Sequence, residues 1–307
     1  MREIQNVSVI GLGAIGAAYA SRLYDMNPNC VRVIADDERI ARYRSRDMVV
    51  NGRAYAFDYV SPETEVHPAD LVIIAVKYEG LAQALVDIRR HVGPDTIILS
   101  LLNGISSEEM IAKAYGDKNL LYAICVAIDA VREGASVRFS GIGRICFGER
   151  DNAVYSPNVQ RVKSLFERAN IPYEIPTDML RTLWWKFMIN VGVNQASAVL
   201  RAPYGVFQTV PEAHEVMVRG MQEVVALAEH VGVHLSQDDI TGFDEILYAM
   251  SPDGKTSMLQ DIEAGRKTEV DYMAGAVRKL GRQYGVATPV NDMFYLVIRA
   301  MEAMQRP

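Results

Sequence analysis

A glycine motif near the N-terminus restricts the fold of this chain more than any other feature. It follows a short β-branched, apolar run, Val7–Ile10, and precedes a segment with helical periodicity, Ala14–Met26. Glycines in the pattern G-x-G-x-x-G allow a tight turn between strand and helix, and they let backbone N–H groups approach a pyrophosphate. The pattern alone also occurs in ordinary turns, but this context predicts a dinucleotide-binding loop made of Gly11, Leu12, Gly13, Ala14, Ile15 and Gly16.

The first half of the chain alternates apolar strands with helices. Its early strands are predicted at Val7–Ile10, Val31–Ala35, Leu71–Val76 and Thr96–Leu101, and the helices between them at Ala14–Met26, Gly80–Arg89 and Ser106–Ala114. Later strands are predicted at Leu120–Ile128, Ser136–Ser140, Gly143–Gly148 and Tyr173–Ile175, with a helix at Asn158–Ala169. Almost wholly apolar strands are typical of parallel sheets covered on both faces. The pattern predicts a Rossmann-type, doubly wound α/β sheet.

The second half of the chain has a different character. After Pro176 nearly every segment has helical periodicity, near residues 178–200, 211–231, 236–250 and 268–284 and from about 289. We therefore predict two domains with a boundary near Thr177: a dinucleotide-binding domain at 1–177 and an all-helical domain at 178–307.

Composition excludes several classes of function. A net charge of −6 argues against a nucleic-acid partner, and the longest apolar stretch, Leu120–Ile128, is too short to cross a bilayer. The three cysteines have neither disulfide nor zinc spacing, which favours a reducing cytoplasm; they are Cys30, Cys125 and Cys146. His230 and His234 are four residues apart, but Gly232 is expected to end the helix between them, so we predict no metal site.

Asp36, at the end of the second predicted strand, bears on the choice of cofactor. A carboxylate there can accept hydrogen bonds from an adenosine ribose diol and would repel a 2′-phosphate, which favours NADH over NADPH. The alternative is that Asp36 caps the helix that follows. Arg39, Arg42 and Arg44 lie close by in the sequence and could accommodate a phosphate.

Two polar residues follow further strands. Lys77 follows Leu71–Val76, and Asn103 follows Thr96–Leu101. Ligands of open α/β sheets bind beyond the carboxyl ends of the strands, so both side chains are candidates for contact with the cofactor. The alternatives are a solvated loop lysine and a simple Asn-Gly turn with Gly104.

Lys186, Asn190 and Asn194 recur at every fourth position of a largely apolar predicted helix. They would therefore line one stripe of that helix. A solvent face is the ordinary explanation of such a stripe, but asparagine is a poor helix former and gains little when merely exposed. The stripe therefore indicates the polar wall of a ligand site.

Two further segments have plainer explanations in the sequence. Gly254-Lys-Thr256 lacks the first glycine of a P-loop and follows a helical segment, so it does not predict a phosphate site. The segment Thr268-Glu-Val-Asp271 has the pattern of a capping box, which alone would explain Glu269 and Asp271.

Taken together, the motifs resemble the ketopantoate reductase (2-dehydropantoate 2-reductase) family over nearly the whole chain, and those from Trp184 onward are specific to it. They are Gly11-x-Gly-Ala-x-Gly16, Val76-Lys77, Asn103-Gly104, Gly134-x-x-Val-x-x-x-Gly141-x-Gly143 with Gly148-Glu149, Trp184-x-Lys186-x-x-x-Asn190-x-x-x-Asn194, Ser257-Met-Leu-Gln-Asp261 and Thr268-Glu269-Val-Asp271.

The resemblance implies an activity and a set of roles. Such enzymes reduce 2-dehydropantoate to D-pantoate with NADPH, in pantothenate biosynthesis, in a cleft between a Rossmann domain and a helical substrate-binding domain. Lys186 would be the catalytic proton donor. Asn190, Asn194 and Ser257 would bind the substrate, Asn103 would contact substrate and cofactor, and Lys77, Ala130 and Glu269 would contact the cofactor.

Two departures from the family pattern leave alternatives open. Asp36 stands where members usually have an arginine, so NADH remains an alternative to NADPH. Tyr204 stands where a further substrate-contacting asparagine is common, so the identity of the small 2-oxo acid is open. The alternatives are an NAD-dependent D-2-hydroxy-acid dehydrogenase of mandelate type and a non-catalytic dinucleotide sensor. The oligomeric state is also open, with a homodimer as one alternative.

Overall fold

The chain divides into two compact units. The computed structural model describes residues 2–305, and the division falls after Leu180, close to the expected boundary at Thr177. The first unit is built around a β-sheet and the second is helical.

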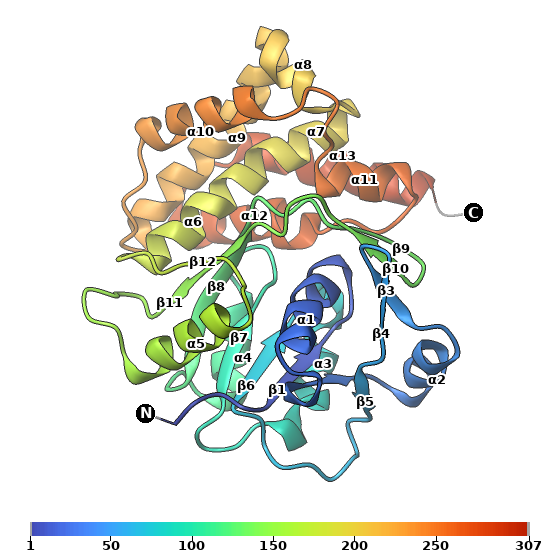
Figure 1. Ribbon diagram of the computed structural model, residues 1–307. Helices are drawn as coiled ribbons and strands as arrows, with labels where there is room; N and C mark the ends of the chain where they lie inside the picture. The colour runs from blue at the N-terminus through green and yellow to red at the C-terminus, as the bar shows by residue number, and fades with distance from the viewer. Residues whose placement is uncertain (1, 306–307) are drawn as a thin grey trace. The chain divides into compact units, whose positions relative to one another are not determined.

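The first unit contains an eight-stranded sheet in the order β12-β11-β8-β7-β6-β1-β2-β5 (Figure 1). Its strands are β1 (Val7–Ile10), β2 (Val31–Ile34), β5 (Asp58–Val60), β6 (Leu71–Ile74), β7 (Ile97–Ser100), β8 (Leu120–Val126), β11 (Arg144–Gly148) and β12 (Tyr173–Glu174). All neighbours pair in parallel except β8 and β11. The predicted Rossmann-type sheet is therefore confirmed, with one antiparallel pair toward its edge.

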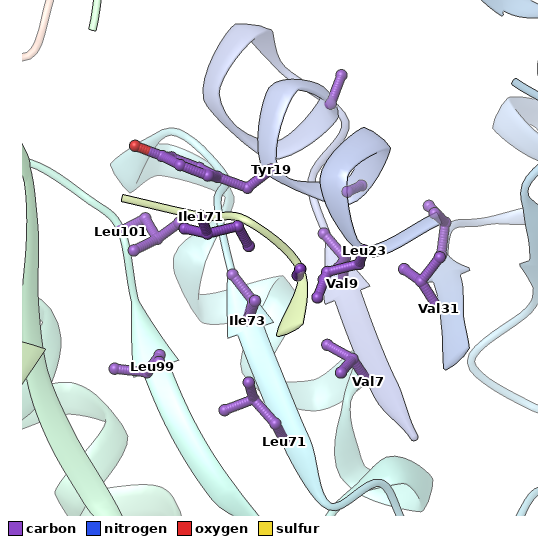
Figure 2. Packing of buried hydrophobic residues seen from close by; sticks show 14 of the residues in the cluster. Val7, Val9, Tyr19, Leu23, Val31, Leu71, Ile73, Leu99, Leu101 and Ile171 are labelled. Carbon is purple, nitrogen blue, oxygen red and sulfur yellow. The ribbon is translucent and has the colours of Figure 1, made fainter. Parts of the chain in front are cut away.

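Helices cover the two faces of this sheet. They are α1 (Ala14–Met26), α2 (Asp37–Ser45), α3 (Leu81–Asp87), α4 (Ser107–Tyr115) and α5 (Pro157–Arg168). Side chains alternate across each strand, so Val7 and Val9 of β1 contribute to the hydrophobic core on the α1 side. Figure 2 shows these valines beside Ile73 of β6 and Leu23 of α1, all at most 1% exposed.

A second, four-stranded sheet was not expected from the sequence. Its order is β4-β3-β10-β9, with β3 at Met48–Val50, β4 at Arg53–Tyr55, β9 at Val131–Glu133 and β10 at Ser136–Arg138. The predicted strand at Ser136–Ser140 exists as β10, but it pairs with β3 and β9 and lies outside the large sheet. The other strands have three residues each, which is too short for a recognisable alternation of apolar and polar residues.

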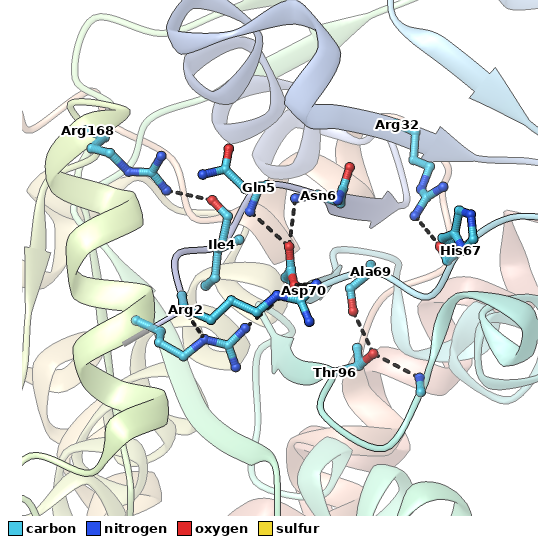
Figure 3. Close-up of polar contacts among 12 residues, drawn as sticks. Arg2, Ile4, Gln5, Asn6, Arg32, His67, Ala69, Asp70, Thr96 and Arg168 are labelled. Atoms are coloured by element: carbon cyan, nitrogen blue, oxygen red, sulfur yellow. Dashed lines mark hydrogen bonds and ion pairs between the residues drawn. The ribbon is translucent and has the colours of Figure 1, made fainter.

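A buried carboxylate anchors the start of the chain to the sheet. Asp70, only 6% exposed, accepts hydrogen bonds from the backbone N–H groups of Gln5 and Asn6 at 2.9 and 3.1 Å (Figure 3). Arg2 and Arg161 lie 3.2 and 3.7 Å from its other oxygen. Partners of opposite charge and N–H donors together offset the cost of burying this carboxylate. Asp70 therefore has a structural role beside β6.

The second unit is all-helical in its described residues, as predicted. Its helices are α6 (Met179–Ile189), α7 (Gln195–Leu200), α8 (Tyr204–Thr209), α9 (Pro211–His230), α10 (Gln237–Ala249), α11 (Ser257–Glu263), α12 (Ala274–Tyr284) and α13 (Pro289–Met304). The helical segment predicted near 178–200 is confirmed, but a π turn at Asn190–Asn194 interrupts its regular geometry between α6 and α7. The helix predicted from residue 268 begins only at Ala274, after a 3₁₀ turn at Val270–Tyr272.

Candidate active site

The glycine loop has the geometry that its sequence predicts. Gly11 has a φ of +97°, and a Cβ there would lie 2.5 Å from the carbonyl oxygen of Ala75. A Cβ on Gly16 would collide with the carbonyl oxygen of Gly11, so glycine is required at both ends of the motif. Gly13 is the N-cap of α1 and provides no side-chain cap for the first turn. A helix that begins in this way offers its N–H groups to an anion, which fits the pyrophosphate of a dinucleotide.

The polar residues after β6 and β7 lie at the same edge of the sheet as this loop. From β1 the chain goes to β2 on one side and later to β6 on the other, so the topological switch point lies between β1 and β6. Lys77 is exposed just beyond β6, and Asn103 is half-buried just beyond β7. Ligands of such sheets bind beside the switch point, at the carboxyl ends of the strands. Ala130, half-buried between β8 and β9, is the remaining predicted cofactor residue of this unit.

A buried chain of hydroxyl and carboxyl groups joins the two ends of the loop that contains Asn103. The Ser100 hydroxyl donates to the Ser107 hydroxyl, which donates to Glu108 Oε2, both at 2.9 Å. Glu108 is 4% exposed, and burial raises its pKa from 4.5 to about 7 although the bond from Ser107 opposes the shift. Burial therefore keeps the proton on this carboxyl group to a higher pH than on a free glutamate. The sequence contains no signal for it beyond its place in the first turn of α4.

Asp36 forms the helix cap that the sequence allowed as an alternative. Its Oδ1 accepts the backbone N–H of Arg39 at 2.7 Å, and its Oδ2 lies 3.4 Å from Arg39 Nε. The side chain is 53% exposed at the end of β2. These two contacts explain the position of the Asp36 side chain without any bound ribose. Contact between Asp36 and the cofactor therefore stays a prediction.

The stripe of Lys186, Asn190 and Asn194 is not a plain solvent face. Lys186 and Asn190 are half-buried, and Asn194 is only 7% exposed. Among the described residues, Asn190 Nδ2 is one of the buried side-chain atoms for which no hydrogen-bond partner is found. A buried amide nitrogen without a partner costs stability, and a bound oxygen ligand would satisfy it.

The π turn changes how the stripe is built. In an α-helix four residues rotate by about 400°, so side chains four apart drift by about 40°. A π turn of about 4.4 residues rotates four residues by about 330°, which reverses most of that drift. The wider turn between Asn190 and Asn194 therefore brings Asn194 back toward the direction of Lys186.

Close packing accompanies the π turn. A Cβ on Gly192 would collide with Met221 Cγ of α9 and lie 2.9 Å from the carbonyl oxygen of Met217. A Cβ on Gly220 would lie 3.6 Å from the Cα of Gly192 and 2.9 Å from Phe294. The backbones of the π turn and α9 can therefore approach closely at Gly192 and Gly220, because neither residue has a side chain. No motif in the sequence marks Gly192 as a position of close packing.

Ser257 lies at the start of α11 but does not cap it. Thr256 is the N-cap of α11, because its hydroxyl accepts the Leu259 N–H at 3.1 Å, and Ser257 is exposed as the first residue of that helix. Helix α11 packs against α7 and the π turn, which brings Ser257 to the part of the unit that carries the asparagines. Lys255 pairs with Glu263 at 2.8 Å, so Gly254-Lys-Thr256 has a structural explanation.

The predicted capping box at Thr268 is wrong. The Thr268 N–H donates to Glu302 Oε1 at 2.8 Å, and the Thr268 hydroxyl donates to the same oxygen at 2.7 Å. The Asp271 carboxylate instead accepts the hydroxyl of Tyr295 at 3.0 Å. Glu302, 34 residues away, has replaced Asp271 as the acceptor of the Thr268 N–H, although the Thr268 hydroxyl still accepts the Val270 N–H at 3.3 Å. Glu269 is half-buried beside Thr268.

Tyr204 holds the turn that leads to Ser257. Its backbone N–H donates to the Gly254 carbonyl at 2.9 Å, and the Gly205 N–H donates to Pro252 at 2.8 Å. The ring is half-buried, and a Cβ on Gly254 would lie 2.9 Å from its Cδ2 atom. The expected replacement of a substrate-contacting asparagine by Tyr204 thus places an aromatic ring beside this turn.

The remaining candidates for other chemistry have structural explanations. Among residues 2–305, no group of three or more His, Cys, Asp or Glu side chains is arranged to hold a metal ion. His230 ends α9 and stacks on Tyr284, and Gly232 follows with a φ of +73°, so the prediction that the helix ends before His234 is confirmed. The three cysteines are buried, and none of them is in a disulfide. Within the described part of the chain, no helix is both long and apolar enough to cross a membrane.

A Rossmann-type unit with this glycine loop, followed by a helical unit with a lysine–asparagine stripe, defines a class of protein: a nucleotide-dependent oxidoreductase. The family described as Ketopantoate reductase PanE/ApbA matches residues 7–152, and its C-terminal part matches residues 178–302. The chain belongs to the ketopantoate reductase family.

Known relatives agree with this assignment over the full length. A 2-dehydropantoate 2-reductase of Streptococcus pyogenes serotype M6 is 25% identical over 306 residues, 97% of this chain and 98% of the relative. A D-mandelate dehydrogenase solved with NADH and anilino(oxo)acetate has a TM-score of 0.88 at 22% identity, covering 98% of this chain and 99% of its own. A dimeric ketopantoate reductase from Staphylococcus aureus has a TM-score of 0.82 at 21% identity, covering 98% and 100%. At such identities the two structures support the fold alone.

Proposed function

We propose that this chain reduces a small 2-oxo acid to its D-2-hydroxy acid, with 2-dehydropantoate as the first candidate substrate and pantoate as the product. The observation that carries the proposal is the stripe of Lys186, Asn190 and Asn194, half-buried to buried, in a chain of the ketopantoate reductase family. The buried, unpartnered Asn190 Nδ2 supports it, because a carboxylate or hydroxyl oxygen of a substrate would supply an acceptor.

The residues have distinct proposed roles. A nicotinamide nucleotide bound at the glycine loop supplies a hydride to the 2-oxo carbon. Lys186 donates a proton to the carbonyl oxygen, and its ammonium charge stabilises the alkoxide that develops there. Asn190, Asn194 and Ser257 orient the substrate by hydrogen bonds, which removes much of the entropic cost of reaching the reactive geometry.

The same proposal assigns the cofactor-binding residues. The backbone of the loop from Gly11 to Gly16 binds the pyrophosphate, and Lys77, Asn103, Ala130 and Glu269 contact other parts of the cofactor. The fit of the loop supports this, since α1 begins at a glycine without a side-chain cap.

For the choice of cofactor we propose that NADH is used at least as well as NADPH. The carboxylate of Asp36 at the end of β2 would face a 2′-phosphate with like charge. Arg39 lies 3.4 Å from the Asp36 carboxylate and offsets part of its charge, so we expect only a modest preference for NADH over NADPH.

A second candidate function is NAD-dependent D-2-hydroxy-acid dehydrogenation of mandelate type. Tyr204 favours it, because its ring lies against the turn before Ser257, where an aromatic substrate could find an apolar contact. The D-mandelate dehydrogenase solved with NADH has the same fold.

A substrate panel tests the proposals together. Oxidation of NADH and of NADPH is followed by absorbance with 2-dehydropantoate, phenylglyoxylate and other bulky 2-oxo acids. Preference for 2-dehydropantoate supports the first candidate, and preference for phenylglyoxylate supports the second. Binding of dinucleotide without turnover of any 2-oxo acid would contradict both and leave a dinucleotide sensor. Light scattering of the purified chain tests a homodimer, the state named for the Staphylococcus aureus enzyme.

A further inference from the structure

We propose that Gln195 is a positioning residue for substrate binding, because its side-chain amide holds the π turn that orients Asn190 and Asn194. The inference rests on the proposed function of those two asparagines. It concerns a residue for which the sequence offered no signal, since Gln195 lies on the apolar side of the predicted helix.

The amide of Gln195 bonds to the backbone of the π turn itself. Its Nε2 donates to the carbonyl oxygen of Val191 at 2.7 Å. In a regular α-helix that carbonyl would accept the backbone N–H of Gln195, four residues on. The backbone N–H of Gln195 donates instead to Gly192. That bond reaches only three residues back, so the Val191 carbonyl lacks its usual partner four residues on, and the side-chain amide of Gln195 satisfies it instead.

The same amide ties the π turn to two other helices. Its second donor bonds to Asn291 Oδ1 of α13 at 3.1 Å, and its Oε1 accepts the N–H of Ala274, the first residue of α12, at 2.9 Å. Asn291 in turn donates to Glu223 of α9 at 2.7 Å. Gln195 is 0% exposed, so these bonds are not in competition with water.

These contacts fix the orientation of the amide. One backbone N–H faces Oε1 and two oxygens face Nε2, so the opposite orientation of the amide would break all three bonds. A side chain without a hydrogen-bond donor at position 195 leaves the Val191 carbonyl without the partner that Gln195 provides. The turn is then expected to relax toward regular helix, which rotates Asn194 away from the stripe.

The test compares Gln195→Met with a matched control. Gln208→Met removes a glutamine amide that also donates to two backbone carbonyls, Leu247 at 2.8 Å and Met250 at 3.0 Å, in a different part of the helical unit. Circular dichroism checks folding of each variant. If Gln195→Met does not fold, Gln195→Glu replaces it, because a glutamate keeps the acceptor for Ala274 and, even when protonated, has one donor at most for the two oxygens that face Nε2.

The readouts separate positioning from general damage. With 2-dehydropantoate, or with phenylglyoxylate if the wild type prefers it, we expect Gln195→Met to raise the KM of the 2-oxo acid at least about tenfold. The Kd of the reduced cofactor, measured by its fluorescence without 2-oxo acid, should stay within about twofold, and Gln208→Met should leave the KM unchanged. In an Asn194→Ala background, Gln195→Met should raise the KM by less than about twofold more, because the two changes remove the same contact.

Each contrary result has its own meaning. An unchanged KM in Gln195→Met, or effects that multiply in the double variant, overturns the positioning role. If the wild type reduces neither 2-oxo acid, the proposed function fails instead. If Asn194→Ala raises the KM and Gln195→Met does not, the proposed function stands and only this inference fails.

Discussion

Two buried titratable groups in the sheet unit should give opposite pH dependences of stability. His91 is 0% exposed, and its Nδ1 lies 2.9 Å from the Ser8 hydroxyl, which also accepts from Arg32 Nε at 3.0 Å. Burial, followed by the charge of Arg32, lowers the pKa of His91 from 6.5 to about 4. Glu108 is the second group, with a pKa that burial raises from 4.5 to about 7.

The sign of each contribution follows from proton linkage. The unfolded chain binds the His91 proton more tightly, so the free energy of unfolding rises with pH between about 4 and 6.5. From about pH 4.5 to about 7.5 this gain is of the order of 2 to 3 kcal/mol. The folded chain binds the Glu108 proton more tightly. The contribution of Glu108 to the free energy of unfolding is therefore fully present below about pH 4.5, and it falls by about 3 kcal/mol between about pH 4.5 and about pH 7.5. In the wild type the two contributions therefore have opposite signs and a similar order of magnitude.

Single variants should expose each effect. His91→Gln, which can still accept the Ser8 hydroxyl, should become less stable toward pH 7.5, and Glu108→Gln should become more stable, each relative to the wild type. Urea unfolding followed by far-UV circular dichroism at about pH 4.5 and about pH 7.5 measures this. Trp184 and Trp185 lie in the helical unit, so their fluorescence reports that unit separately. Parallel pH dependences in all three proteins would refute the reasoning.

Three further predictions concern the proposed site. Lys186→Ala should keep the fold and cofactor binding but lose at least about a hundredfold in kcat; near-normal turnover by a folded variant would refute its role as proton donor. Asn194→Ala and Ser257→Ala should chiefly raise the KM of the 2-oxo acid, by a factor that corresponds to about 1 to 3 kcal/mol of lost binding free energy. An unchanged KM in both variants would mean that the substrate binds elsewhere. Asp36→Asn, which keeps a good helix cap, should shift kcat/KM toward NADPH by about 1 kcal/mol or fivefold; an unchanged ratio would show that Asp36 does not face the ribose.

Local patterns predicted the parts of the fold that depend on local interactions. The observed limits of β1 and α1 are those predicted, because an apolar β-branched run, a glycine turn and a periodic helix follow one another without interruption. The small sheet was missed because its pairing is non-local: Val49 of β3 is paired with Ser136 of β10. The Thr268 cap was mispredicted for the same reason, since Glu302 bonds to it from another helix.

The candidate site shows the same division between local and distant causes. The spacing of Lys186, Asn190 and Asn194 identified the polar stripe, but a regular helix would carry Asn194 about 80° away from Lys186 around the axis. The π turn reverses most of that drift, and its packing partners are distant in sequence. Met217 and Met221 pack closely against Gly192, and residues of α12 and α13 form hydrogen bonds with Gln195. A π turn departs from regular helix geometry, and this one is accompanied by many tertiary contacts. Such turns inside α-helices occur frequently at functional sites. The coincidence of this turn with the two asparagines is therefore an argument, independent of family membership, that this stripe binds a ligand.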